Sequence, residues 1–156
     1  MSPAGRFFED FTVGLRFSSP QPIVMSAEGI KAFAADFDPQ PFHLGDAGPD
    51  SFFGGLVASG WHTAAVAMRL LVDSDLGLCG QGAGLAVEAL RFVRPVRPGD
   101  SLRLEGAVTE VRPSGSRPDR GIVKFQTTVT NQRNEVVLDA RHVIVALRRP
   151  ASPRGV

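Results

Sequence analysis

An aspartate and a histidine lie five residues apart in segment 38–43, which reads Asp-Pro-Gln-Pro-Phe-His. The two prolines are unfavourable inside a helix, so we expect an irregular loop here. A stiff loop can direct the side chains of Asp38 and His43 into one space. A carboxylate and an imidazole held together form a general acid–base pair near neutral pH. On spacing alone, however, the simpler interpretation is a proline-rich surface turn whose polar residues share no function.

Two helices are predicted around this segment. Ser26 is a good N-cap residue, and apolar residues follow it at helical spacing as far as Phe37. The prolines then end this first helix, over 26–37. A second helix is predicted over 59–72, and it is apolar on nearly every side until Arg69. Such a helix is expected to be buried on most sides, with other elements packed closely against its small early residues.

From Gly84 onward, apolar residues recur at every second position, which is typical of strands. Candidate strands cover 85–93, 101–112, 121–131 and 135–148, and they follow one another through turns and one loop. One buried helix against one long antiparallel sheet is an α+β architecture. A curved sheet can wrap the helix and bury it, and this arrangement is the hotdog fold.

The composition is that of one ordinary globular domain. The chain has 156 residues, 43% hydrophobic and 21% charged. We expect a single domain over 1–150 and a frayed, polar tail over 151–156. Lys and Arg number 17 and Asp and Glu 16, so the basic excess typical of nucleic-acid binding is missing. We find no apolar signal core and no membrane-spanning stretch, so we expect no membrane association and a cytoplasmic location.

Other residues with reactive or aromatic side chains are assigned structural roles. The single cysteine, Cys79, excludes an intramolecular disulfide and a cysteine-based zinc cluster, and we expect no metal and no separate cofactor. His62 is expected to be a hydrogen-bonded core residue of the second helix. His142 is expected to be a structural or exposed residue of the last strand. Trp61 is expected to serve core or dimer packing.

Segment 38–43 resembles the Asp-x-Asn-Pro-x-His signature of the MaoC-like dehydratases, which include the (R)-specific enoyl-CoA hydratases. The Asp, Pro and His of the signature match in register, and Gln40 stands where the family usually has Asn. The likeness continues in 53–60, although Ser59 stands where the usual member has His. It also includes 91–100, which ends in a Pro-Gly-Asp turn. The resemblance therefore covers most of the chain.

This resemblance implies a hydro-lyase that adds water to a 2-enoyl thioester or removes it from the 3-hydroxyacyl form. Asp38 and His43 would hold the water and move its protons, and which of them takes which proton stays open. Charge on the thioester oxygen needs hydrogen-bond donors, which the start of the second helix offers. Gly60 is the natural donor beside Ser59, although close helix–sheet packing also explains this glycine. Gln40 would orient the loop or the water.

Coenzyme A would enter as part of the substrate, and four arginines offer contacts to its phosphates unless they form a solvated face: Arg91, Arg94, Arg97 and Arg103. Because a single curved sheet leaves open edges, we expect a homodimer or a higher homo-oligomer with the acyl site at its interface. The alternatives are a hotdog thioesterase and a noncatalytic acyl-thioester-binding subunit. The Asp–His segment argues against both, while Gln40 and Ser59 leave some room for the second.

Overall fold

The structure is a computed structural model that describes residues 5–78 and 80–152. It contains an antiparallel sheet in the order β1-β4-β5-β6-β3, with β2 pairing to β4. The strands are β1 (Arg16–Ser18), β2 (Ile23–Val24), β3 (Gly82–Phe92), β4 (Ser101–Pro113), β5 (Arg120–Thr130) and β6 (Val136–Leu147). The helices are α1 (Ala27–Phe37), α2 (Pro41–Leu44) and α3 (Gly60–Asp73), after a short 3₁₀ helix at Phe8–Asp10. The predicted α+β architecture and its four long strands are confirmed.

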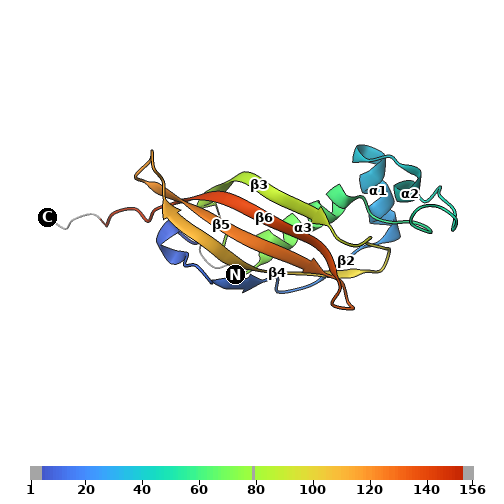
Figure 1. Cartoon of the computed structure of the whole chain (residues 1–156), viewed down its shortest axis with the longest axis horizontal. Coiled ribbons are helices and arrows are strands. Elements are labelled where there is room, and N and C mark those ends of the chain that lie inside the picture. The colour runs from blue at the N-terminus through green and yellow to red at the C-terminus, as the bar shows by residue number, and fades with distance from the viewer. Residues whose placement is uncertain (1–4, 79, 153–156) are drawn as a thin grey trace.

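Helix α3 lies along one face of the curved sheet, while α1 and α2 gather beyond one end of it (Figure 1). Its buried face consists of Thr63, Ala67, Leu70 and Leu71. The three apolar side chains of this face join one core with inward-facing sheet residues such as Phe125. The sheet thus fixes the helix, and the start of the helix lies at the end of the sheet where α1 and α2 are placed.

The expectation that α3 is buried on most sides is wrong for the single chain. Trp61, Met68 and Val72 are 62%, 48% and 47% exposed. Strand β3, at the edge of the sheet, also leaves large apolar side chains in solvent, including Leu85 and Val87 at 57% and 53%. The apolar character of α3 was predicted correctly, but the other elements of the same chain do not bury all of its apolar side chains.

Segment 38–43 also differs from the expected loop. Pro41 starts a one-turn helix, α2, in which His43 lies. Proline is favourable at a first helical position, because its missing N–H would have no partner there. Gly45 then ends the turn with a φ of 84°, a left-handed conformation that favours glycine. The prolines therefore position His43 on a rigid turn rather than preventing a helix.

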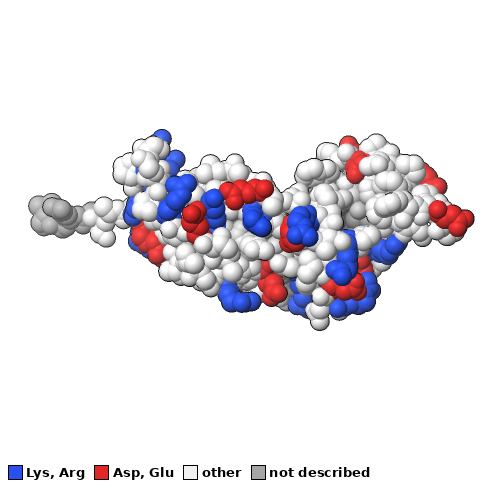
Figure 2. Space-filling view, viewed as in Figure 1, with Lys and Arg blue, Asp and Glu red and all other residues white. Residues whose placement is uncertain are grey.

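Basic and acidic side chains lie interspersed over the face of the sheet that Figure 2 shows. The near balance of charge in the sequence thus also holds locally on this face. No helix of the described residues is long and apolar enough to cross a membrane. The predictions for Cys79 and for 153–156 concern residues outside the described part of the chain, and the single domain over 1–150 stays a prediction.

Candidate active site

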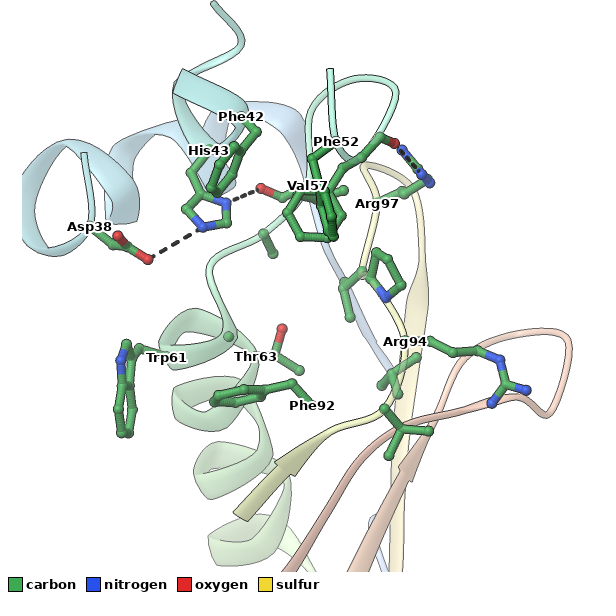
Figure 3. Close-up of a pocket in the computed structure, with 17 residues that line it drawn as sticks. Asp38, Phe42, His43, Phe52, Val57, Trp61, Thr63, Phe92, Arg94 and Arg97 are labelled. Atoms are coloured by element: carbon green, nitrogen blue, oxygen red, sulfur yellow. Dashed lines mark hydrogen bonds and ion pairs between the residues drawn. The ribbon is translucent and has the colours of Figure 1, made fainter. Parts of the chain in front are cut away.

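Asp38 and His43 come together beyond the sheet. Asp38 directly follows α1, where its backbone N–H donates to Ala34 and ends the helix. Its Oδ2 lies 3.3 Å from Nε2 of His43, and the two side chains are 20% and 7% exposed (Figure 3). The pair is therefore largely withdrawn from solvent, unlike the surface turn that spacing alone favoured.

The orientation of the His43 ring is fixed by the backbone. Nδ1 lies 2.7 Å from the carbonyl oxygen of Val57. A carbonyl oxygen only accepts, so Nδ1 is the donor, and Nε2 is the nitrogen directed at Asp38. An unprotonated Nε2 and an ionised Oδ2 are both hydrogen-bond acceptors and do not attract each other. Their contact is favourable when one proton lies between Nε2 and Oδ2, or when a water molecule donates to both atoms. Nε2 is thus the atom of this ring that can exchange protons with a substrate.

The carboxylate of Asp38 is held by two further side chains. The amide of Gln40 donates to Oδ1 at 2.7 Å, and the hydroxyl of Ser59 donates to Oδ2 at 2.7 Å. The hydrogen bonds from Gln40 and then Ser59 hold the pKa of the Asp38 carboxyl below its usual range. Partial burial raises the pKa of this carboxyl, and the charge of His43 lowers the pKa further. Asp38 is therefore ionised at neutral pH and able to accept a proton.

Gly60 is the first residue of α3, and it lines the same cavity as the acid–base pair. Its N–H has no acceptor among the described residues. A Cβ added here would lie 2.8–2.9 Å from ring atoms of Phe92 on β3. Both explanations of this glycine thus have support: it allows close helix–sheet packing, and it leaves a free donor at the positive end of a helix.

The cavity beside the pair has a volume of about 640 Å³. Its walls are mostly apolar, and the aromatic residues among them are Phe42, Phe52, Phe53, Trp61 and Phe92. Arg97 donates from its guanidinium to the carbonyl oxygen of Phe53 at 2.6 Å and so ties the loop between α2 and α3 to the connection between β3 and β4 (Figure 3). The sequence reading missed these phenylalanines, since nothing in their spacing indicates a shared wall.

A family model for the MaoC-like domain matches residues 10–132. The chain belongs to the MaoC-like domain family. The crystal structure of a MaoC-like dehydratase from Rhodospirillum rubrum is 51% identical in sequence. That match covers 94% of this chain and 100% of that one, with a TM-score of 0.87. The predicted family is thereby confirmed.

Two other relatives carry names that describe an activity. The mesaconyl-CoA hydratase of Cereibacter sphaeroides is 31% identical over 154 residues, 96% of this chain but 44% of that protein. The chain thus spans less than half the length of this relative. The R-hydratase PhaJ1 from Pseudomonas aeruginosa is 24% identical, covers 96% of each chain and has a TM-score of 0.74. With these neighbours, the hotdog fold of this MaoC-like domain is confirmed.

The remaining predicted residues of this MaoC-like domain lie in varied surroundings. His62 stacks on Phe33 with ring centroids 4.7 Å apart, but its buried Nδ1 has no hydrogen-bond partner among the described residues. The predicted hydrogen bond of His62 is therefore wrong for this nitrogen. Of the four arginines, Arg94 and Arg97 line the cavity, and their contact to coenzyme A stays a prediction. Among the described residues, no group of three or more His, Cys, Asp or Glu side chains is placed to hold a metal ion.

Proposed function

We propose that this MaoC-like domain is a hydro-lyase that hydrates a 2-enoyl thioester, or dehydrates the 3-hydroxyacyl form, with acyl-CoA as substrate. The observation that carries the proposal is the 3.3 Å contact between Nε2 of His43 and Oδ2 of Asp38 at the edge of an apolar cavity. General acid–base catalysis needs two such groups within reach of one water. The named hydratase among the relatives supports the same class of reaction.

We propose a role for each group in this mechanism, and the hydrogen bonds of the site support it. Asp38, whose pKa is held low, accepts a proton from water as the water oxygen bonds to C3. The electron pair of the double bond moves towards the thioester, and Nε2 of His43 delivers a proton to C2. A proton then passes from Asp38 to His43 across their short contact and restores the pair. The free N–H of Gly60 stabilises the negative charge on the thioester oxygen.

Crotonyl-CoA tests this proposal, because its hydration removes the absorbance of the enoyl thioester. A thioesterase would release free thiol instead, and a binding subunit would do neither. Asp38→Asn and His43→Ala are each expected to lower kcat/KM by roughly 10²–10⁴-fold. The losses should be non-additive, since either change disables the pair. Activity close to wild type in either variant would refute the proposed roles.

We further propose a homodimer in which a second copy covers the apolar surface of α3 and β3. Edge strands with exposed apolar residues promote association, and contiguous apolar patches mark interfaces. The residues of this surface are Trp61, Met68, Val72, Leu85, Val87 and Phe92. Trp61 and Phe92 also line the cavity, so the second copy would complete its wall.

Light scattering at micromolar concentration tests the dimer. Val87→Asp places a charge in the proposed interface and is expected to yield monomers. Val13→Asp is the matched control, because Val13 is 67% exposed and lies outside this surface, before β1. A wild-type monomer, or equal behaviour of the two variants, would contradict the proposal.

A further inference from the structure

A second cavity lies between α3 and the sheet, with a volume of about 160 Å³. Trp61, the second residue of α3, lines both this cavity and the cavity of the acid–base pair, so its side chain lies between the two spaces. Its walls are mostly aliphatic side chains such as Leu71, Leu90 and Leu138. Figure 3 shows Trp61 and Phe92 at the first turns of α3, on the side of the first cavity away from His43. An acyl chain that passes Trp61 would therefore enter this second space.

Two polar side chains interrupt this apolar lining. Nε2 of His142, on β6, lies 3.1 Å from Oγ1 of Thr127, on β5. The His142 ring stacks on Phe125 with centroids 4.8 Å apart, which fixes its plane. Thr127 is only 1% exposed. Polar groups that face an apolar space are unfavourable unless they are hydrogen-bonded.

The hydrogen-bonding capacity of this pair is not exhausted by their mutual contact. Nδ1 of His142 has no partner among the described residues, and it is not among the side-chain atoms that the protein fully encloses. Nδ1 of His62, by contrast, is fully enclosed. His142, which lines the cavity, thus retains one ring nitrogen that is accessible and without a partner, whereas the free nitrogen of His62 is enclosed.

We propose that His142 and Thr127, which line the second cavity, select acyl chains that carry a hydroxyl or carbonyl oxygen in their distal part. The proposal rests on the proposed function, because it takes an acyl thioester as the ligand. A purely hydrocarbon chain would leave Nδ1 of His142 without a partner, and a site built to hydrogen-bond an oxygen rejects the analogue that lacks it. The small volume favours a short chain over a long one.

A neutral oxygen suits the pair better than a carboxylate. Burial lowers the pKa of His142, so its ring is neutral near pH 7 and offers one donor and one acceptor. A hydroxyl group can use either. No Lys or Arg lines this cavity among the described residues, so a buried carboxylate would find no opposite charge.

Trp61 is the only tryptophan, and it lines both cavities, so its fluorescence reports ligand entry. Saturated thioesters bind but cannot be hydrated, which separates binding from catalysis. We would titrate the full chain with hexanoyl-CoA, ω-hydroxyhexanoyl-CoA and the ω-carboxy analogue, and repeat the series with butanoyl and octanoyl chains. At the chain length that places the oxygen at the pair, the hydroxylated ligand is expected to bind about tenfold more tightly than the other two.

Thr127→Val and His142→Phe are expected to abolish this preference, because each removes polar atoms while nearly keeping the volume. Thr128→Val is the matched control: it lies on the same strand with its side chain on the opposite face, where it lines a different pocket. A melting curve for each variant identifies loss of fold, and Thr127→Val is the milder change should His142→Phe unfold. The preference should survive in Thr128→Val.

The outcomes separate this inference from the proposed function. No preference at any chain length in the wild type, or an unchanged preference in Thr127→Val and His142→Phe, would overturn the subsite even if crotonyl-CoA is hydrated. A preference that both variants lose would support the subsite even if crotonyl-CoA is not hydrated, and the site would then bind acyl thioesters without the proposed chemistry.

Discussion

Ser59→Ala removes one hydroxyl group that makes two contacts. Ser59 is 0% exposed, and its Oγ donates to Oδ2 of Asp38 at 2.7 Å. The same oxygen accepts from the N–H of Trp61 at 3.3 Å and so caps α3. Alanine adds no atoms, so every effect of the change comes from losing these contacts.

The loss of stability follows from the two contacts. Removing a serine N-cap lowers the free energy of unfolding by about 1 kcal/mol. Removing a hydrogen bond to a charged group lowers it by roughly 1.5–3 kcal/mol more. A total of about 3 kcal/mol corresponds to a fall in Tm of roughly 6–12 °C for a domain of this size.

The pH dependence distinguishes a positioning role from a purely structural one. Ser59 is the second-largest cause, after Gln40, of the lowered pKa of Asp38, so Ser59→Ala raises that pKa. A carboxyl with a lowered folded-state pKa adds stability above its unfolded pKa, and this stability is lost as the pH falls through the folded value. The variant forfeits part of that stability at neutral pH. Because Asp38 accepts a proton in the proposed mechanism, the acid limb of kcat/KM moves to higher pH.

Ser26→Ala is the matched control. Ser26 caps α1 by accepting from the N–H of Gly29 at 3.0 Å, and no hydrogen bond joins it to Asp38. It should lose about 1 kcal/mol of stability and keep the wild-type pH profile. Ser59→Ala should also lose roughly 10- to 100-fold in kcat/KM through misplacement of the carboxylate. Identical pH profiles in the two variants would show that Ser59 only caps its helix.

Two further changes test the surroundings of the site. Gly60→Ala places a methyl group against the ring of Phe92 and is expected to lower kcat/KM. Adding Phe92→Ala to the same chain removes the crowding and should restore part of the lost kcat/KM. If kcat/KM does not recover, crowding is not the cause. His43→Ala leaves the carbonyl of Val57 without its donor and should lower the free energy of unfolding by about 1–3 kcal/mol. A melting curve that matches wild type would contradict this.

The helices and strands were predictable because apolar residues repeat with clear periods. The helical spacing up to Phe37 and the two-residue period after Gly84 set the elements to within a few residues. Ser59 was also predicted to stand at the start of the second helix, because small and apolar residues follow it. Its hydrogen bond to Asp38 was not, because the two residues lie 21 apart in the chain and meet only through the fold.

Two errors have definite physical causes. The prolines were taken to exclude a helix, but Pro41 occupies the one helical position where proline is favourable. The apolar character of α3 was taken to mean burial within one chain. Sequence alone does not distinguish a residue that its own chain covers from one such as Trp61, which stays 62% exposed. Hydrophobicity shows that a side chain is expected to be buried, but not whether its own chain or another molecule buries it.

Three helix ends meet at the candidate site, and this explains how one place can support both proton transfer and charge stabilisation. Asp38 follows the end of α1, His43 lies in α2, and Ser59 and Gly60 begin α3. The positive end of α3 therefore faces the carboxylate through Ser59 and the cavity through the N–H of Gly60. In the proposed reaction Asp38 loses its negative charge as the thioester oxygen gains one. The same helix end stabilises the charge before and after it moves, so little of the surrounding field has to rearrange during the step.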